Sequence, residues 1–275
     1  MGLFAAGSRI RIIGHRGAAG VAPENTVVAI EHGVEAGSDA LEVDVHVTTD
    51  GHLVTIHDDT VDRTTNGTGP AEAMSLAQLQ ALDAGYQFTP DMGRTFPFRD
   101  RGIRIPTLDE AVEAGGELPM IIEVKSPDAG RALGDWLRTR RARGRGDLGR
   151  FIVGGFDRAA VAPAAAEADW ECATRRDLVP FVLFGKLGIR APLRREIDAV
   201  MLPIRKGPMR LVTRRFVRQA HARDLGVFVW TVNRPDVMRR LLDLGVDGLI
   251  SDVPARVRRV LAERIAAGEA DMSPI

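Results

Sequence analysis

The stretch ALEVDVHVTTDGHLVTIHD at residues 40–58 places two carboxylates within an apolar run and an imidazole shortly after them. Glu42 and Asp44 stand two positions apart, and side chains at that spacing on a β-strand point to the same face. The Asp-Gly pair predicts a tight turn, after which 53–56 returns as a short strand and brings His57 back toward the carboxylates. Two carboxylates beside an imidazole suit a metal-assisted site, although a solvated acidic edge strand would show the same pattern.

The rest of the chain predicts a regular alternation of strands and helices. Eight apolar strand segments each precede a helical segment, and the short return at 53–56 stands outside this count. The strands are expected at 11–14, from 40 onward, and at 120–124, 151–156, 171–174, 199–202, 226–232 and 248–251. Such alternation predicts parallel strands with right-handed crossovers, and eight repeats predict a single α/β (β/α)8 barrel, the TIM-barrel fold.

One segment, at about 59–104, interrupts the alternation after the second strand. It is rich in Gly, Pro, Thr and Asp, and its one expected helix, around 75–82, is short. Because the segment lacks an apolar pattern large enough for a core of its own, we interpret it as a small insertion. We therefore expect one barrel domain over 1–275.

Composition excludes some classes of partner. Lys plus Arg and Asp plus Glu each total 37, so the formal net charge is zero and no global charge favours nucleic acid or an anionic membrane. The single cysteine, Cys172, excludes an intrachain disulfide and is expected to be a small buried hydrophobe. The first residues contain no sustained apolar signal region, and no apolar run is long enough for a transmembrane helix. These features predict a cytoplasmic protein.

Polar residues recur where the expected strands end, which is where the reactive groups of such barrels gather. They are His15 and Arg16 after the first strand, Glu42 and Asp44 late in the second, Glu123 and Lys125 at the end of the third, Trp230 near the end of the seventh, and Asp252 after the eighth. Burying three carboxylates in one barrel costs several kcal/mol each unless they are paired or bind a metal. A shared site at one mouth of the barrel accounts for them better than packing alone.

Eight motifs follow one another in a fixed order along the chain. They are GHRG at 14–17, PENT at 23–26, LEVDVHVTTDG at 41–51, VTIHDDTVDRTT at 54–65, IPTLDEA at 105–111, IIEVK at 121–125, WTVN at 230–233 and GVDGLISDVP at 245–254. With these motifs the chain resembles the glycerophosphodiester phosphodiesterase family, within the wider phospholipase C-like phosphodiesterase group. Each motif alone is weak, but their order makes the resemblance specific. The chain departs from the family at 154–157, where GGFD replaces a common Ser-Phe-Asp, and at Ser251, where threonine is common.

The resemblance implies metal-dependent hydrolysis of glycerophosphodiesters to glycerol 3-phosphate and an alcohol. His15 and His57 would form the acid–base pair, and the sequence leaves open which of them is the acid. The nucleophile would be either water or the 2-hydroxyl of the substrate. Glu42, Asp44 and Glu123 would bind one divalent cation, and a set of hard oxygen ligands favours Mg²⁺ or Ca²⁺.

The same resemblance assigns the substrate contacts. Arg16 and Lys125 would bind the phosphate, because guanidinium and ammonium groups neutralise phosphoryl oxygens. Trp230 would form an apolar wall for the glycerol, although packing inside the barrel explains a tryptophan there nearly as well.

Other polar residues receive structural roles or none. His46 shares the strand face of the two carboxylates but matches no site residue of the family. Asn25 or Thr26 is expected to cap a helix that starts near 27, and Asn233 to cap the helix that follows it.

Two other functions are compatible with the sequence. The first is lysophospholipase D-type cleavage of a lipid-bearing diester, for which the apolar segment 178–187 and the aromatic residues of 84–100 could line a lipid site. The second is a catalytically inactive barrel that binds a phosphodiester, which the intact histidines and carboxylates argue against. The expected partner is a small glycerophosphodiester or lysolipid and no nucleic acid, and the sequence gives no oligomeric state.

Overall fold

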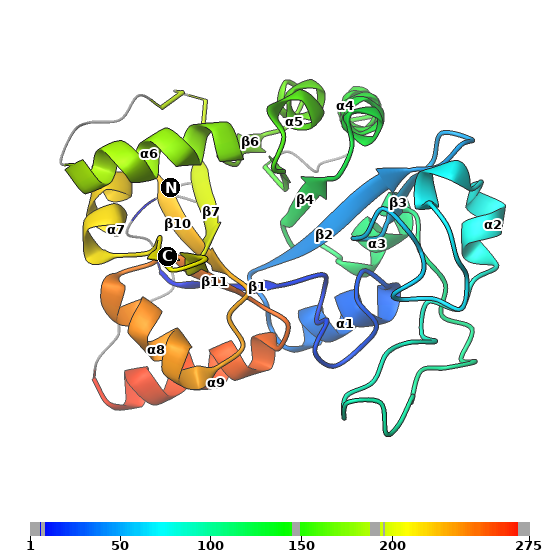
Figure 1. Cartoon of the computed structure of the whole chain (residues 1–275), viewed down its shortest axis with the longest axis horizontal. Coiled ribbons are helices and arrows are strands. Elements are labelled where there is room, and N and C mark those ends of the chain that lie inside the picture. Colours follow the sequence, from blue (N-terminus) through cyan, green and yellow to red (C-terminus); the bar gives the residue numbers. More distant parts are fainter. Residues whose placement is uncertain (1–5, 7–8, 145–148, 188–192, 195, 269–275) are drawn as a thin grey trace.

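Parallel strands form the wall of a barrel in the computed structural model, which describes residues 6, 9–144, 149–187, 193–194 and 196–268 (Figure 1). The strands are β1 (Arg11–Gly14), β2 (Ala40–Val47), β4 (Met120–Val124), β5 (Phe151–Gly154), β6 (Trp170–Glu171), β7 (Ala199–Pro203), β10 (Gly226–Trp230) and β11 (Gly248–Ser251). They pair in the order β6-β5-β4-β2-β1-β11-β10-β7, and a parallel bridge between Cys172 and Ala199 joins the two ends. The predicted (β/α)8 barrel is confirmed, as a nearly closed ring.

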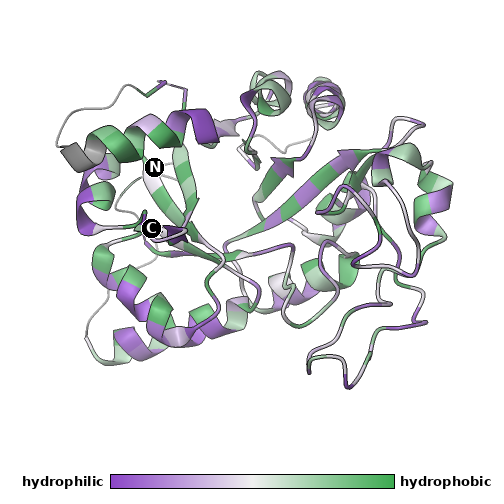
Figure 2. Ribbon diagram, viewed as in Figure 1, coloured by the Kyte–Doolittle hydropathy of each residue, from purple (hydrophilic) through white to green (hydrophobic). Residues whose placement is uncertain are grey.

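Helices cover the outside of this ring. They are α1 (Val27–Glu35), α3 (Leu108–Ala114), α4 (Pro127–Ala142), α5 (Arg158–Ala165), α6 (Arg175–Leu187), α7 (Arg214–His221), α8 (Pro235–Leu244) and α9 (Pro254–Ala266). Side-chain caps set several of the helix starts: Thr26 accepts a hydrogen bond from the N–H of Ala29, and Thr107 forms a capping box with Glu110. Figure 2 shows hydrophobic residues along the strands and polar residues on the outer helices. No helix in the described ranges is long and apolar enough to cross a membrane.

The barrel interior is closed by one apolar layer. Each of the eight strand positions contributes one residue to it: Ile13, Ala40, Ile121, Ile152, Cys172, Ala199, Phe228 and Ile250. Because alternate residues of a strand face the same side, the residues two positions further on form the next layer toward the carboxyl ends. This layer contains His15, Glu42, Glu123 and Trp230, so the strand register itself places the expected site directly above an apolar floor.

Three strands are shorter than the sequence predicts. The segment 151–156 leaves the ladder at Gly154, 171–174 is reduced to Trp170–Glu171, and 226–232 ends at Trp230. In each case the residues beyond the strand belong to the loops around the mouth of the barrel. Several of these loop residues line a cavity, among them Phe156, Ala173 and Thr231, and their small or apolar side chains extend the apparent strand.

The segment after β2 adds structure outside the ring. β3 (Leu53–Thr55) pairs antiparallel with the end of β2, and the N–H of Ile56 donates to the carbonyl of Asp44 at 3.1 Å. Beyond it lie a 3₁₀ helix, η1 (Ala71–Ala73), and the short helix α2 (Leu76–Gln80). The segment has a small apolar cluster, made by Val54, Ile56, Val61, Ala71, Leu79, Ala84 and Ile105. It therefore packs against β3 as a small layer of its own, at the right of Figure 1.

Candidate active site

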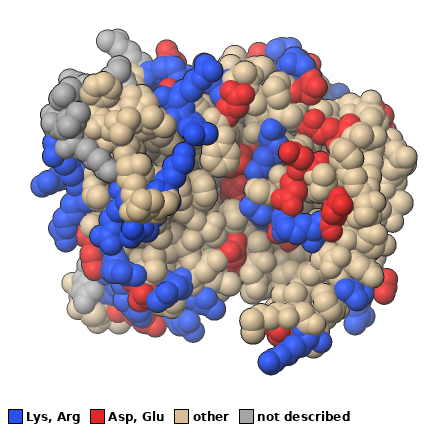
Figure 3. All heavy atoms as spheres, viewed as in Figure 1, with Lys and Arg blue, Asp and Glu red and all other residues tan. Residues whose placement is uncertain are grey.

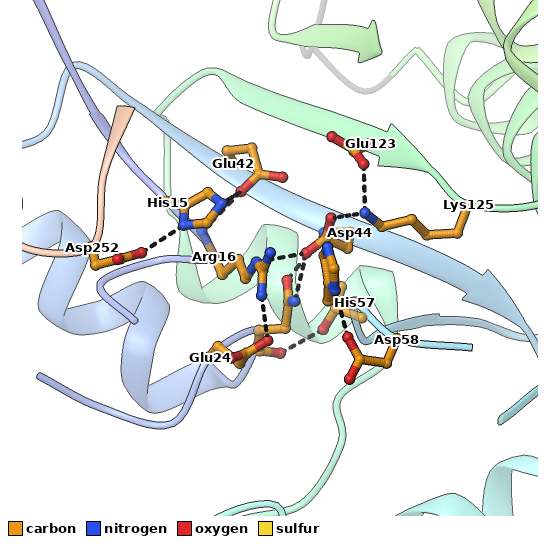
Figure 4. A network of polar contacts seen from close by, with 12 residues as sticks. His15, Arg16, Glu24, Glu42, Asp44, His57, Asp58, Glu123, Lys125 and Asp252 are labelled. Carbon is orange, nitrogen blue, oxygen red and sulfur yellow. Dashed lines mark hydrogen bonds and ion pairs between the residues drawn. The ribbon is translucent and has the colours of Figure 1, made fainter. Parts of the chain in front are cut away.

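Three carboxylates meet at the carboxyl ends of β2 and β4. The parallel register sets Asp44 opposite Glu123, and Glu42 lies two residues earlier on the same face of β2. One carboxylate oxygen from each of the three lies within 4.8 Å of the others (Figure 4). Glu42 and Asp44 are buried, with 5% and 1% of their surface exposed, so this is a buried acidic cluster rather than a solvated edge.

Two cations neutralise only one side of the cluster. The ammonium of Lys125 lies 2.6 Å from Asp44 Oδ1 and 2.5 Å from Glu123 Oε1, and the Nε of Arg16 lies 3.2 Å from Asp44 Oδ2. Burial alone would raise the pKa of Asp44, but the charges of Lys125 and Arg16 hold it below the usual value. Asp44 therefore stays ionised despite its burial.

Glu42 lacks such compensation. Its Oε2 accepts a hydrogen bond from the backbone N–H of Arg16 at 2.9 Å and lies 3.9 Å from the Nε2 of His15. No lysine or arginine side chain of the described residues lies within ion-pair distance of it. Burial, together with the negative charges of Asp44 and Glu123, raises the pKa of Glu42 to about 8. Glu42 therefore keeps its proton near neutral pH, and a third ionised carboxylate would need a further cation beside Lys125 and Arg16.

His15 is held by a carboxylate from the other end of the chain. Its Nδ1 lies 2.6 Å from Asp252 Oδ1, just beyond β11. Burial lowers the pKa of His15, but the hydrogen bond to Asp252 and the charge of Glu42 outweigh burial and raise it. Since a carboxylate can only accept, Nδ1 carries the proton, and Nε2 is the nitrogen left for chemistry.

Asn233 does not cap α8, contrary to expectation. Its amide donates to Asp252 Oδ2 at 2.5 Å and its oxygen accepts from the N–H of Asp252 at 3.0 Å, while Arg234 occupies the N-cap position without a side-chain bond. Asn233 therefore holds the Asp252 carboxylate, which in turn holds His15. The amide of Asn233 bonds to Asp252 instead of the helix terminus.

His57 has a carboxylate partner of the same kind. Its Nδ1 lies 2.6 Å from Oδ1 of the adjacent Asp58, again leaving Nε2 for chemistry. Arg63 donates to both oxygens of Asp58, at 2.6 and 3.1 Å, and this hydrogen-bonded guanidinium holds the pKa of Asp58 well below its usual range. The antiparallel return of β3 carries this group to the cluster, as the sequence predicts.

The loop after β1 ties these groups together. Glu24 accepts two hydrogen bonds from Arg63, both at 2.7 Å, and one from Arg16 at 2.6 Å. Asn25, with φ at 58°, donates to Asp44 Oδ2 at 2.9 Å and accepts from the N–H of Asp44 at 3.0 Å. The left-handed conformation, which asparagine tolerates, turns its amide toward β2, so Thr26 and not Asn25 caps α1.

A cavity of about 640 Å³ opens above the cluster. Most of the predicted site residues line it, namely His15, Arg16, Glu42, Asp44, His57, Glu123 and Trp230. Lys125 does not, because its ammonium is turned onto Asp44 and Glu123. Figure 3 shows acidic side chains within a hollow near the centre of this face, with Lys and Arg side chains on either side. Cys172 also lines the cavity, and burial raises the pKa of its thiol, as for an unreactive cysteine.

Four residues of this network are absent from the site expected from sequence, namely Glu24, Asn25, Asp58 and Arg63, and Asp252 is expected at the mouth of the barrel but without a role. The strand register offers a signal for Asp252, which follows the buried Ile250 by two residues and so belongs to the same inward layer. Asp58 is signalled by its position next to His57. The other three act from loops, and only the loop conformation brings them to the site.

The arrangement can bind a divalent cation and move protons. Three oxygen donors of like charge within 4.8 Å, one with a raised pKa, fit a divalent cation that prefers hard oxygen ligands. Two imidazoles, each with Nδ1 paired to a carboxylate, can accept or donate a proton at Nε2. Both requirements of a phosphodiester hydrolase are therefore present around one cavity.

Comparison with known proteins gives one consistent result. Residues 15–256 match the sequence model of the Glycerophosphoryl diester phosphodiesterase family. A glycerophosphodiester phosphodiesterase of Caldanaerobacter subterraneus subsp. tengcongensis is 32% identical over 251 residues, which cover 88% of this chain and 94% of that protein. One from Bacillus subtilis is 28% identical over 264 residues, covering 92% and 86%.

Solved structures show the same fold. A phosphodiesterase of Oleispira antarctica, in complex with the product sn-glycerol-3-phosphate, superposes with a TM-score of 0.72 at 23% identity, covering 92% of this chain and 96% of that chain. A glycerophosphodiester phosphodiesterase of Agrobacterium tumefaciens has a TM-score of 0.68 at 26% identity, covering 91% and 99%.

Proposed function

Because the chain belongs to the glycerophosphoryl diester phosphodiesterase family, it is an enzyme that hydrolyses glycerophosphodiesters, and we propose how its own residues do so. Glu42, Asp44 and Glu123 bind one divalent cation, Mg²⁺ or Ca²⁺, and His15 and His57 transfer the protons. The products are glycerol 3-phosphate and an alcohol: an oxygen from water bonds to phosphorus, the phosphorus–oxygen bond to the alcohol breaks, and a proton goes to the leaving oxygen.

The observation that carries this proposal is the buried cluster itself, in which Glu42, Asp44 and Glu123 each bring an oxygen within 4.8 Å of the others and Glu42 has no lysine or arginine partner among the described residues. Burial, with the charges of Asp44 and Glu123, raises the pKa of Glu42 to about 8, so ionising all three carboxylates is costly for packing alone. A divalent cation would offset that cost. When bound, it supplies a Lewis acid for the phosphoryl oxygens and a template for the glycerol hydroxyls.

The histidines would act through their Nε2 atoms. Asp252 and Asp58 each accept from Nδ1, which fixes the tautomer and the ring orientation before the substrate arrives. One Nε2 removes the proton from the attacking hydroxyl, and the other donates a proton to the leaving oxygen. Either water attacks phosphorus directly, or the 2-hydroxyl attacks first and expels the alcohol to form a cyclic phosphate, which water then opens to glycerol 3-phosphate.

The side chains of Arg16 and Lys125 would bind the phosphate by giving up part of their present contacts. Arg16 contacts Glu24 and Asp44, and Lys125 contacts Asp44 and Glu123. When a divalent cation occupies the cluster, these carboxylates share their charge with it, so the two side chains can turn part of their donor capacity to the phosphoryl oxygens. Trp230, which stacks edge-to-face with Phe156 at 6.0 Å between ring centroids, would form the apolar wall beside the glycerol.

Chelation tests the proposal. Glycerophosphocholine hydrolysis, followed as glycerol 3-phosphate release, should stop in EDTA and return with Mg²⁺ or Ca²⁺. Glu42→Gln keeps the shape of the side chain but removes a charged ligand, and it should weaken cation binding in a calorimetric titration. Glu263→Gln, on the outer face of α9, is the matched control and should bind the cation as the native protein does. Full activity after chelation would rule out a required cation.

A further inference from the structure

The cavity above the catalytic cluster has two chemically different halves. One half holds the polar groups already described. The other is walled by apolar side chains from α6, from the end of β7, from the loop after β5 and from the short hairpin of β8 (Arg205–Lys206) and β9 (Met209–Arg210). Prominent among them are Phe156, Val179, Val182, Leu183, Met201 and Met209. The two halves are continuous, so a ligand at the cluster extends directly over the apolar wall.

Several of these apolar side chains are exposed where folding would be expected to bury them. Phe156 is 55% exposed, Val179 45% and Leu183 51%, and all three line the cavity. Large apolar side chains gathered at a cavity mouth, rather than scattered singly, mark a surface that is covered when a ligand binds. The wall is therefore better explained by a ligand than by the core.

The charges around this half exclude a small cationic ligand. The two charged side chains that line it are cationic, Arg175 and Lys206, and both are exposed. Among the described residues that line the cavity, the carboxylates are Glu42, Asp44 and Glu123, all in the polar half. A substituted ammonium would thus meet like charge and no carboxylate there, whereas an uncharged chain would meet matching surface.

We infer that this half is a subsite for an aliphatic chain carried by the phosphodiester, so that the preferred substrates are amphiphilic diesters. The inference rests on the proposed function, because the same cluster must hold the phosphate. The chain can be attached in two ways, as an acyl group on the glycerol or as an alkyl group on the leaving alcohol. In both modes of attachment the apolar wall would contact the same kind of group, an aliphatic chain.

Only one of the two segments expected to line a lipid site does so. Leu178, Val179, Val182 and Leu183 of α6 line the cavity, as the apolar segment 178–187 predicts. The aromatic residues of 84–100 do not: Phe88 and Phe98 pack edge-to-face at 5.2 Å, and Arg99 stacks on Tyr86 and Phe96. These aromatic residues stabilise the inserted segment, away from the cavity.

Two substrate series at concentrations below micelle formation test the inference. The first has glycerophosphate esterified to methanol, butanol, hexanol and octanol, and the second is glycerophosphocholine with acyl chains of two to eight carbons on the glycerol. We expect kcat/KM to rise in at least one series, by about fourfold for each methylene that becomes fully buried. The series that responds identifies the end of the substrate that lies on the wall.

Neighbouring residues of α6 provide a matched pair of variants. Leu183 lines the cavity and Phe184 does not, although both are exposed and their replacement should leave the fold intact. Within the series that responds, Leu183→Ser should lower the ratio of kcat/KM for the longest chain to that for the shortest by about fivefold, and Phe184→Ser should leave that ratio unchanged. Equal effects of the two variants would overturn the subsite.

The outcomes separate the inference from the function on which it rests. If glycerophosphocholine is hydrolysed but kcat/KM is flat or falls with chain length in both series, the aliphatic subsite is wrong and the hydrolase stands. If no diester is hydrolysed with Mg²⁺ or Ca²⁺, the proposed function is wrong. Calorimetric binding of n-alkylphosphonates then decides the subsite, since their Kd should still fall with each methylene, and a Kd independent of length overturns it.

Discussion

Each histidine of the site is held by a carboxylate that accepts a hydrogen bond from its Nδ1. We expect His15→Ala and His57→Ala each to lower kcat by about a hundredfold or more, the usual effect of losing a general acid or base. Cation affinity should change little, because neither ring is a proposed ligand. Calorimetric titration of Mg²⁺ into each variant checks this, and a His57→Ala protein that no longer binds the cation would make His57 a ligand instead.

The leaving group assigns the two roles. A diester of p-nitrophenol needs no protonation of its leaving oxygen, so the variant without the general acid should recover most of its activity on it. The variant without the base should stay slow on the same substrate. Equal recovery of both variants would contradict the two-histidine scheme.

Arg63 links the carboxylate that holds His57 to the carboxylate that holds Arg16 through hydrogen-bonded ion pairs. It donates to Asp58, which orients His57, and to Glu24, which pairs with Arg16. We expect Arg63→Ala to lower kcat by roughly tenfold through misplaced proton transfer, with KM changed less. Arg63→Lys should recover part of the loss, because one ammonium cannot make both forked contacts. Arg104→Ala, an exposed arginine paired with Glu110, is the control, and equal losses in both arginine variants would indicate a general effect on folding.

Between elements, the inserted segment is attached to the barrel by this ion-pair network. Burial would raise the pKa of Glu24, but the hydrogen bonds and charges of Arg63 and Arg16 lower it overall. A carboxyl with a lowered pKa in the folded state stabilises the fold above its unfolded pKa of about 4.3, and loses that contribution as pH falls through its folded value.

Glu24→Gln should therefore destabilise the protein at pH 6 and matter progressively less below pH 4. Urea unfolding of both proteins across this range measures the difference. A difference in unfolding free energy that stays constant down to pH 3 would show that the charge of Glu24 contributes nothing to stability.

At the level of the elements, the sequence predicts the positions of those site residues that lie on regular strands. The two-residue period of β2 and β4 places Glu42, Asp44 and Glu123 together without knowledge of any loop. The contact of Arg63 with Glu24 joins residues 39 positions apart and depends on turns in an irregular segment. No periodic pattern in the sequence predicts such a contact. For the same reason Asn233 resembles a helix cap, although Asp252 supplies its partners.

In the whole molecule, the cation should act as a folding ligand as well as a cofactor. Anything that binds the native state alone stabilises it, and at a hundred times Kd the gain is about 2.7 kcal/mol. We expect the free energy of unfolding to rise by about that amount with saturating Mg²⁺ or Ca²⁺, and by much less in Glu42→Gln. Stabilisation of equal size in the variant would place the cation elsewhere.

The barrel closes between β6 and β7 through the parallel bridge of Cys172 with Ala199, whereas its other neighbouring strands share longer ladders. The proposed acid–base histidines and the acidic cluster belong to β1, β2, β4 and the ends of β3 and β11, across the ring from this joint. α6 and β7, which flank the joint, carry the apolar wall. The proposed chain subsite and the proposed catalytic groups thus lie on separate arcs of the barrel, so substitutions beside the joint should change the range of substrates without changing the reaction.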